Sequence, residues 1–260
     1  MAKTYALVTG GSSGIGLEIG KLLAAKGYPL LLVSNEEEKL LRLKVELQQQ
    51  YKVPVEILPI NLAQSEAAQK VYDYCKQNGI EVEVLVNNAG FFFFGQITDA
   101  DISRAQEKIL LHVMTSSLLC TLFGKEMKKR GKGFILNNAS ISAYKDFPGI
   151  GYYGATKSYI KSFTRSLHTE LKFYGVHVTC LCPGATATNL YDPNVIDIEL
   201  GKALGIMMSA EKVAKLGVNG LFKNKAVVIP GFMTKLMLVL ALLTPQWMIY
   251  EIRKRVKSLK

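Results

Sequence analysis

The stretch Tyr5-Ala6-Leu7-Val8-Thr9-Gly10-Gly11-Ser12-Ser13-Gly14-Ile15-Gly16 decides the fold of this chain. Residues 5–9 are mostly apolar and predict a buried strand, and residues 15–26 predict a helix. Glycines in the turn between them let the backbone approach a pyrophosphate closely, and the helix N-terminus offers free amides to that anion. In this context, the spacing Gly-x-x-x-Gly-x-Gly indicates dinucleotide binding. The expected contacts come from Gly10, Ser12, Ser13, Gly14, Ile15 and Gly16.

The rest of the chain alternates strands with helices almost to its end. Further strands are expected at residues 30–34, 55–60, 84–87, 133–139, 176–182 and 226–229. Further helices are expected at residues 36–51, 65–78 with Ser65 as N-cap, 100–129, and from about 152 to 174. The strands are continuously apolar, as in parallel sheets covered on both faces. We therefore predict a single α/β domain over residues 1–260, a doubly wound, Rossmann-type parallel seven-stranded sheet with helices on both faces.

A tyrosine and a lysine carry the clearest chemical signal. Tyr153 and Lys157 are four residues apart on a predicted helix, so their side chains share one face. A phenol titrates near ~10, and an adjacent ammonium lowers its pKa by favouring the phenolate. The pair therefore predicts a general acid/base beside the dinucleotide, suited to reducing a carbonyl or oxidising an alcohol.

The residues that end the second strand bear on the choice of dinucleotide. Folds that select NAD usually place a carboxylate there, against the ribose hydroxyls. Here Ser34 and Asn35 are uncharged and would not repel a 2′-phosphate, although no arginine is present to bind one. Glu36 follows, and it is either a ribose ligand or a first-turn residue of the next helix. On balance we expect NADP(H) to be favoured over NAD(H), with Ser34 and Asn35 in contact with it.

The segment Asn87-Asn88-Ala89-Gly90 closes the fourth strand. Its asparagines can hold adjacent backbones in place, and Gly90 leaves room for the adenosine ribose. We therefore expect Asn88, Ala89 and Gly90 to line the cofactor site. Four consecutive phenylalanines follow at 91–94, and they fit a wall of the substrate cleft and ordinary core packing equally well.

These residues together resemble the short-chain dehydrogenase/reductase family, in the branch that contains hydroxysteroid and ketoacyl reductases. The resemblance covers almost the whole chain. It rests on five motifs in the family's order: Thr9-Gly10-x-x-x-Gly14-x-Gly16, Asn87-Asn88-Ala89-Gly90, Ser140, Tyr153-x-x-x-Lys157 and Pro183-Gly184. Ser140 lies thirteen positions before Tyr153, which is the usual family interval.

The resemblance implies a role for each matching residue. Tyr153 would donate a proton to the carbonyl oxygen during reduction, and Ser140, preferred over Ser142, would hydrogen-bond that oxygen. Lys157 would hold the nicotinamide ribose and lower the pKa of Tyr153. Pro183 and Gly184 would end the sixth strand at the cofactor. Thr188 stands where the family binds the nicotinamide carboxamide, and Thr186 is a second candidate.

Two positions depart from the family's pattern. Asn61, followed by Leu62, stands where an aspartate commonly lies against the adenine, and an amide oxygen can still accept a bond from the adenine amino group. His112 stands where the family has an asparagine that holds a helix kink near the active-site lysine. A histidine could keep that backbone role, shuttle protons near neutral pH, or simply pack inside a kinked helix.

Two segments are expected to handle the substrate and a surface. Specificity should lie in the apolar loop 189–209, beyond the carboxyl end of the sixth strand. The extension 232–260 begins with an apolar run, is broken at Pro245, and ends in a basic helix whose apolar side would hold Trp247, Ile249, Ile252 and Val256. That helix fits an anionic membrane surface, a neighbouring subunit or a lid, and we lean towards the last two because the apolar run could be buried against the protein.

Composition narrows the remaining possibilities. The formal net charge is +11, but most lysines are scattered over helices, which argues against a nucleic-acid binder. The four cysteines lack zinc-ligand spacing and are expected to be free thiols in a reducing compartment. No hydrophobic leader precedes the first strand, so we expect a cytoplasmic location, with peripheral membrane contact as an addition.

The leading interpretation is an NADP(H)-dependent oxidoreductase that interconverts a ketone and a secondary alcohol on a hydrophobic, lipid- or steroid-like substrate, and that forms a homo-oligomer. The alternative is a catalytically silent, dinucleotide-binding or membrane-associated scaffold with the same fold. An intact set of Ser140, Tyr153 and Lys157 favours the enzyme.

Overall fold

The computed structural model describes residues 4–188 and 206–255, and it contains the predicted parallel sheet. Seven strands follow the order β3-β2-β1-β4-β5-β6-β9, and every neighbouring pair is parallel. These strands are β1 (Thr4–Thr9), β2 (Leu30–Ser34), β3 (Val55–Pro59), β4 (Glu81–Asn87), β5 (Gly133–Asn138), β6 (Val176–Leu181) and β9 (Val227–Val228). A second, two-stranded sheet pairs β7 (Thr186–Ala187) with β8 (Met208–Ser209). The predicted Rossmann-type fold class is confirmed, whereas the small sheet was not predicted.

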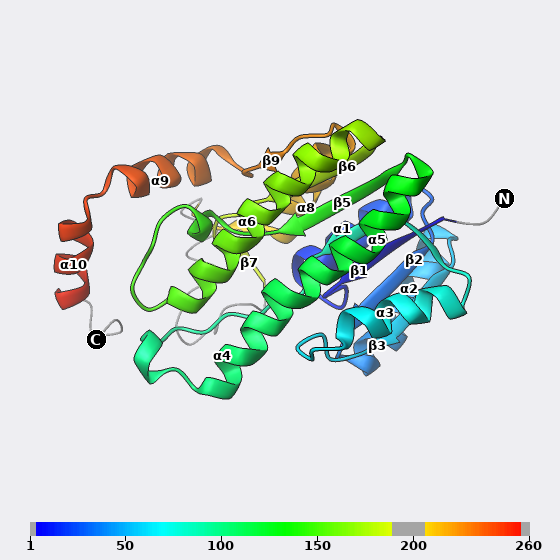
Figure 1. Ribbon diagram of the computed structural model, residues 1–260, viewed down its shortest axis with the longest axis horizontal. Coiled ribbons are helices and arrows are strands. Elements are labelled where there is room, and N and C mark those ends of the chain that lie inside the picture. Colours follow the sequence, from blue (N-terminus) through cyan, green and yellow to red (C-terminus); the bar gives the residue numbers. More distant parts are fainter. Residues whose placement is uncertain (1–3, 189–205, 256–260) are drawn as a thin grey trace.

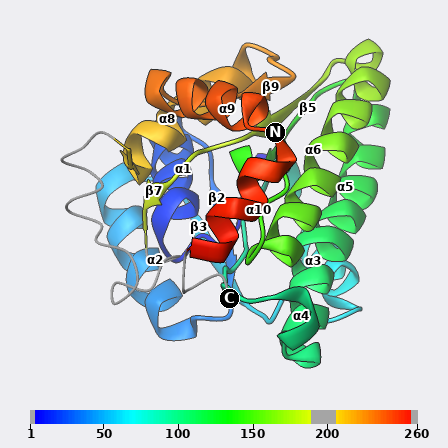
Figure 2. The ribbon, with the colours of Figure 1, turned by 90° about the vertical axis from the view of Figure 1, so that its left-hand side faces the viewer.

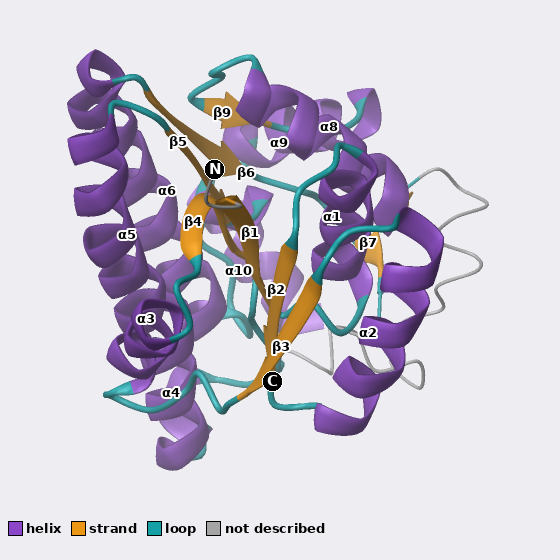
Figure 3. Ribbon diagram, turned by 90° about the vertical axis from the view of Figure 1, so that its right-hand side faces the viewer, coloured by secondary structure: helices purple, strands orange, loops and turns teal. Residues whose placement is uncertain are grey.

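Helices cover both faces of the large sheet, as Figure 3 shows. One face carries α1 (Gly14–Ala25), α2 (Glu37–Tyr51) and α8 (Ala210–Phe222), and the other carries α3 (Ala67–Gln77), α5 (Ser116–Arg130) and α6 (Gly151–Leu171). Side chains alternate along each strand, so Ala6 and Val8 of β1 enter the first core and Leu7 enters the second. Two buried cores explain why the strands are apolar on both faces.

The direction of winding reverses beside β1. From β1 the chain proceeds to β2 and β3 on one side, and from β4 it proceeds to β5 and β6 on the other. Ligands of open α/β sheets bind where two connections diverge in this way, at the carboxyl ends of the strands. The turn that begins at Gly10 and the segment that begins at Asn88 both lie at this point, directly after β1 and β4.

The helix predicted over residues 100–129 is divided by a wider segment. It consists of α4 (Ile102–Ile109), the π-helical segment η2 (Leu110–Thr115) and α5. Within η2, the Thr115 hydroxyl donates to the carbonyl of Leu62 at 2.8 Å and so ties the segment to the loop after β3. A π turn holds one more residue per hydrogen-bonded ring than an α turn, and such insertions occur mostly at functional sites. The apolar periodicity of the sequence does not reveal it.

The predicted N-cap of α3 is wrong. The helix begins at Ala67, its N-cap residue is Glu66, and no side chain caps it. The Ser65 hydroxyl instead donates to the Glu66 carboxylate at 2.7 Å. A charged acceptor makes a stronger hydrogen bond than a neutral one, which explains why the hydroxyl is directed to the carboxylate.

The C-terminal extension forms α9 (Phe232–Leu243) and α10 (Gln246–Arg255), which lie at the opposite end of the molecule from the N-terminus (Figure 1). Only Thr234 and Leu238 of α9 are buried, so the expectation that this apolar run is covered by the protein is wrong. In α10, Ile249 is 4% exposed and Trp247 is 66% exposed, so the two do not share one apolar side. The side chain of Ile252 and the whole of Val256 lie outside the described residues.

The C-terminal extension is held near the start of α6. The Lys145 ammonium donates to the carbonyl of Thr244 at 3.0 Å, which fixes the junction of α9 and α10 to the loop before α6. Figure 2 shows α10 crossing in front of the start of α6. Among the described helices, none combines the length and apolarity needed to cross a membrane.

Candidate active site

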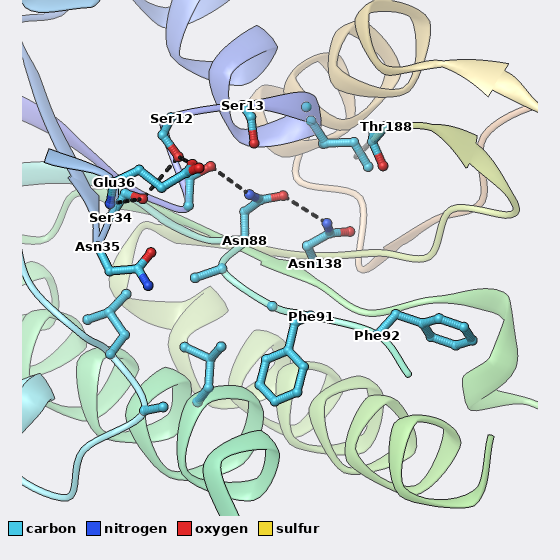
Figure 4. Close-up of a pocket in the computed structure, with 18 of the residues that line it drawn as sticks. Ser12, Ser13, Ser34, Asn35, Glu36, Asn88, Phe91, Phe92, Asn138 and Thr188 are labelled. Carbon is cyan, nitrogen blue, oxygen red and sulfur yellow. Dashed lines mark hydrogen bonds between the residues drawn. The ribbon is translucent and has the colours of Figure 1, made fainter. Parts of the chain in front are cut away.

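A crevice of about 600 Å³ opens at the carboxyl ends of β1 and β4, and Figure 4 shows a close-up of residues that line it. Fifteen predicted cofactor or catalytic residues line it: Gly10, Ser12, Ser13, Gly14, Ile15, Ser34, Asn35, Asn61, Leu62, Asn88, Ala89, Gly90, Tyr153, Lys157 and Thr188. The glycine turn, the end of β2, the end of β4 and the start of α6 therefore meet at one site.

The glycine turn is as tight as its sequence predicts. Gly10 has φ +62°, in the left-handed region, and a Cβ added there would lie 2.9 Å from the Cα of Ala89. A Cβ at Gly16 would lie 2.2 Å from the carbonyl oxygen of Gly10. Side chains at either position would therefore collide with backbone. The turn leaves the amides at the start of α1 accessible, so these residues fit a dinucleotide pyrophosphate.

A polar network fixes the turn against the end of β4. The Thr9 hydroxyl accepts hydrogen bonds from the amides of Asn88 at 2.9 Å and Ala89 at 3.1 Å. The Asn88 side-chain amide donates to the carbonyls of Thr9 at 3.2 Å and Gly10 at 3.3 Å. In turn, the Asn138 amide donates to the Asn88 carbonyl oxygen at 2.9 Å (Figure 4). The ends of β1, β4 and β5 are thus held in one fixed arrangement.

The corner beyond β2 holds a carboxylate among hydroxyls. The Ser12 hydroxyl donates to Glu36 at 2.6 Å and lies 2.9 Å from the Ser34 hydroxyl (Figure 4). Lys39 forms an ion pair with Glu36, and both line the crevice. The hydrogen bonds from Lys39 and Ser12 lower the pKa of the Glu36 carboxyl. Glu36 is therefore ionised and held in a fixed orientation at the end of β2. The sequence alone did not decide whether it is a ribose ligand or a first-turn residue of α2.

The predicted catalytic pair lies on the first turns of α6 and lines the same crevice. Lys157 is 5% exposed, and its ammonium donates to the carbonyl of Asn138 at 2.7 Å. Burial lowers the pKa of Lys157 to about 8. Its Nζ atom lies 5.6 Å from the centre of the Tyr153 ring. The two residues therefore face the same space, as their spacing of four residues predicts.

Ser140 follows β5 and begins the short 3-10 helix η3 (Ile141–Ala143), against which α6 packs. It is 8% exposed, and its hydroxyl oxygen accepts a hydrogen bond from the Ser142 amide at 3.1 Å. That bond leaves the Ser140 hydroxyl proton available to a substrate oxygen. The hydroxyl of Ser142, by contrast, is buried and has no hydrogen-bond partner among the described residues.

His112 is buried in η2 and uses both ring nitrogens. Its Nε2 atom accepts from the Phe91 amide at 3.2 Å, so the proton of the neutral ring is on Nδ1. Nδ1 lies 3.0 Å from the Thr156 hydroxyl, which itself donates to the carbonyl of Tyr153 at 2.9 Å and can accept from the ring. Burial, followed by the charges of Lys157 and Lys108, holds the pKa of His112 well below its usual range. The ring is therefore a neutral brace between η2, α6 and the loop after β4.

The remaining predicted residues lie next to the crevice. The carbonyl of Pro183 accepts from the Ile141 amide at 3.0 Å, and that of Gly184 accepts from the Thr186 hydroxyl at 3.0 Å. Five predicted residues support the crevice without lining it in the described part of the chain: Gly16, His112, Pro183, Gly184 and Thr186. Most of the predicted substrate loop, residues 189–205, lies outside the described residues.

Asn138 and Lys108 are two of the residues at or beside the site that were missed from the sequence. Asn138 joins Asn88 to Lys157, and the only indication of it was a second asparagine at the end of an apolar strand. Lys108 is fully buried one helical turn before His112, with its Nζ atom 3.5 Å from the centre of the Phe93 ring. A lysine on the buried face of α4 was the available signal.

The comparisons with known proteins agree with this geometry. The model of the short chain dehydrogenase family matches residues 4–197. A very-long-chain 3-oxoacyl-CoA reductase of the fungus Phaeosphaeria nodorum is 32% identical over 184 residues, 68% of this chain and 53% of the relative. The mouse protein of the same name is 28% identical over 255 residues, 95% of this chain and 78% of the relative. The chain therefore spans little more than half the length of the fungal relative.

Among solved structures, a short-chain dehydrogenase from Sphingobium yanoikuyae in complex with NADPH superposes with a TM-score of 0.81. It is 26% identical, and the match covers 88% of each chain.

Proposed function

The chain belongs to the short-chain dehydrogenase family, and on that premise we propose that it is an oxidoreductase that interconverts a ketone and a secondary alcohol on a hydrophobic substrate, using NADP(H). The observation that carries the proposal is the placement of Tyr153 and Lys157 in the wall of the dinucleotide crevice. This reaction requires an acid/base and a nearby cation beside the bound dinucleotide, and both share one crevice with the glycine turn.

Each residue has a distinct task in the proposed reduction. A bound nicotinamide dinucleotide would supply the hydride. Tyr153 gives its phenolic proton to the carbonyl oxygen, so the ketone becomes an alcohol and the tyrosine a phenolate. Ser140 holds the same oxygen with its hydroxyl proton. Lys157, fixed by the Asn138 carbonyl, stabilises the phenolate by its charge. In the oxidation direction the phenolate takes the proton back.

The class of substrate is inferred from the wall next to the catalytic pair. Phe91 and Phe92 line the crevice, and the ring of Phe92 packs edge-on against Tyr153 with the centroids 5.0 Å apart. Of the two roles expected for the phenylalanines, this arrangement supports the cleft wall for Phe91 and Phe92. Apolar side chains at the reacting end favour a substrate with a lipid- or steroid-like body.

A panel of carbonyl compounds tests the reaction. Long-chain ketoacyl thioesters, steroid ketones and small polar ketones are incubated with NADPH, and the loss of its absorbance is followed. We expect turnover with the apolar compounds and little with the polar ones. Turnover confined to polar ketones would overturn the proposed substrate class, and no turnover with any compound would favour the silent, dinucleotide-binding alternative.

We propose NADP(H) because Ser34 and Asn35 are neutral and Lys39 lines the same corner. A 2′-phosphate there would pair with Lys39, whereas the Glu36 carboxylate beside it would oppose the phosphate. Titrating NADPH and NADH into three proteins tests this. The parent should bind NADPH more tightly, Asn35→Asp should reverse the preference, and Glu36→Gln should strengthen it. If the parent binds NADH more tightly, Glu36 is a ribose ligand and the proposed preference is wrong.

We further propose that the exposed face of α9 contacts an anionic membrane surface. Eight large apolar side chains of this helix are exposed: Phe232, Met233, Leu236, Met237, Val239, Leu240, Leu242 and Leu243. Residues 232–260 carry six basic residues and one acidic residue. A symmetric contact between two such segments would bring like charges together, whereas anionic lipids would complement them. Homo-oligomerisation, which we also propose, would therefore use another face.

A further inference from the structure

Lys108 is a buried cation that the proposed reaction does not yet use. It belongs to α4, its side chain is fully buried, and no hydrogen-bond acceptor reaches its Nζ atom in the described part of the chain. Lysine is almost never fully buried unless it is paired, because removing an ammonium from water is costly. A solitary ammonium at this depth therefore calls for a functional explanation.

Aromatic faces surround this ammonium. Its Nζ atom lies 3.5 Å from the centre of the Phe93 ring, 5.2 Å from that of Phe91 and 5.8 Å from that of Phe92. The negative faces of aromatic rings attract cations and take the place of a hydrogen-bonded partner. The three consecutive phenylalanines of the loop after β4 are thus folded around Lys108.

The fourth ring near Lys108 is that of Tyr153. The Lys108 Nζ atom lies 5.6 Å from the centre of the Tyr153 ring, and the Lys157 Nζ atom is at the same distance of 5.6 Å. Lys108 comes from α4 and Lys157 from α6. Two buried lysines from different helices therefore flank the proposed acid/base, and only Lys157 belongs to the recognised motif.

Among the described residues, the other charged or titratable groups near Lys108 do not neutralise it. Arg104, one turn earlier on α4, lies over Phe91 and Phe93 and is a second cation. Lys157 and Tyr153 face it from α6, and the neutral ring of His112 in η2 lies 5.9 Å from the Tyr153 ring. Burial, reinforced by the charges of Arg104 and Lys157, lowers the pKa of Lys108 to about 7. Lys108 can therefore gain or lose its proton in the physiological range.

We propose that Lys108 is a positioning residue for Tyr153, which holds the phenylalanine wall against the phenol and adds a second positive charge beside it. This inference rests on the proposed function, because it assumes that Tyr153 is the acid/base. When Tyr153 becomes a phenolate, the Lys108 ammonium gains an anionic neighbour. The two groups therefore titrate as a coupled pair, and Lys108 shifts the pH at which the phenolate forms towards neutrality.

Replacing the lysine by an apolar residue of similar length tests the proposal. In Lys108→Met, the rate of alcohol oxidation should reach half its maximum at a pH higher by about one unit, because one nearby positive charge is lost. The matched control is Lys128→Met, which removes an exposed lysine that lies 4.1 Å from the ring centre of Tyr174. Its pH profile should coincide with that of the parent.

Three further measurements make the outcome unambiguous. NADPH binding followed by fluorescence should be unchanged in Lys108→Met, which shows that the crevice is intact. Lys108→Arg keeps the charge, and if it folds its pH profile should stay close to that of the parent. The melting temperature of Lys108→Met at pH 6 should be higher than that of the parent, since an unpaired buried ammonium is removed.

The proposal fails if the pH profile of Lys108→Met coincides with that of the parent. It also fails if turnover is lost at every pH while NADPH still binds, because Lys108 would then contact the substrate directly. The proposed function is tested separately by Tyr153→Phe. If that variant keeps its turnover, the acid/base is another residue. If it loses turnover while Lys108→Met keeps the parent profile, only the role of Lys108 is wrong.

Discussion

The ring of Tyr153 is contacted by side chains from three parts of the chain. Phe92 comes from the loop after β4, Lys108 and His112 from the helix broken by the π segment, and Lys157 from α6 itself. At the residue scale, the orientation of one phenol therefore depends on segments that are far apart in the sequence. Substitutions at the ring and around it should have separable effects.

The first prediction concerns the phenol itself. Tyr153→Phe keeps the ring and removes the acidic hydroxyl, so turnover should fall by at least ~100-fold, within the range for acid/base groups. Affinity for NADPH should change little. Tyr152→Phe is the matched control, since Tyr152 is the adjacent tyrosine on α6 and does not line the crevice. Steady-state assays and cofactor titrations measure both, and a Tyr153→Phe variant within a few-fold of the parent would refute the assignment.

The second prediction concerns His112. Both ring nitrogens of His112 are engaged in hydrogen bonds, so we propose that it braces the fold and does not relay protons. His112→Asn should lower the free energy of unfolding by about 1–3 kcal/mol, because buried hydrogen-bonding groups lose their partner. The pH dependence of turnover should be unchanged. Chemical denaturation and a pH–rate profile measure the two effects, and a displaced profile with unchanged stability would restore the proton relay.

Sequence reasoning identified the residues whose role depends on local spacing. Tyr153 and Lys157 are four residues apart on one helix, and Ser140 follows β5, thirteen positions before Tyr153. Lys108 could not be placed in the same way, because its burial requires residues 91–93 to fold over α4. Asn138 was missed for a similar reason, since its role depends on β4 and β5 lying side by side.

At the scale of elements, the strands were easier to predict than the breaks in helices. A buried strand is marked by a continuous apolar run, and β2 has the predicted bounds. The segment η2 leaves no comparable mark, because a π turn changes hydrogen bonding over six residues without changing composition. The exposure of α9 was also unpredictable, since the apolar composition of a helix does not indicate whether another element packs against it.

The third prediction concerns α9 and belongs to this scale. The full-length protein should co-sediment with vesicles that contain anionic lipid and be released as salt rises, since each basic residue near such a surface contributes about 1 kcal/mol. Replacing Phe232 and Leu243 by serine should weaken this binding, because both side chains are more than 70% exposed. The matched control is Phe173→Ser, which removes a side chain that is 87% exposed on the segment after α6.

Deleting residues 246–260 gives a second arm of this experiment. NADPH binding should survive, because α10 contributes nothing to the dinucleotide crevice. If the intact protein ignores vesicles but the truncated protein changes its oligomeric state, then the extension is a subunit contact and the membrane proposal is wrong.

At the scale of the whole molecule, buried bases and thiols determine how stability depends on pH. In the folded state the pKa of Lys108 is about 7 and that of Lys157 about 8, both below the ordinary value of 10.5, and the pKa of His112 is also lowered. The unfolded chain therefore binds more protons over this range, so stability rises with pH. Burial raises the pKa of the Cys75 and Cys120 thiols to about 12, so near pH 9 and above the folded state keeps thiol protons that the unfolded chain loses. This opposes the contribution of the lysines and outweighs it between about pH 9 and 10, where stability begins to fall.

The fourth prediction follows from these signs. The free energy of unfolding should increase from pH 6 to between about pH 9 and 10, and then decrease. Denaturant titrations across this range measure it, and the rise should be smaller in Lys108→Met, which lacks one of the depressed bases. A maximum below pH 7 would show that these groups are more hydrated than their burial indicates.

The small sheet of β7 and β8 has a consequence for how this protein can change over time. Ala187 pairs with Ser209, and the Met208 amide donates to the carbonyl of Ala185 at 3.1 Å, so the described residues before and after 189–205 are joined to each other. Insertions, deletions or replacements between Ala187 and Met208 should cost little chain entropy, since that cost rises only slowly with the number of residues between two joined points. Such changes leave α6, which carries Tyr153, and the glycine turn unaltered. Replacing the residues between Ala187 and Met208 by the corresponding residues of a relative should therefore change the substrate preference while the rest of the protein still folds.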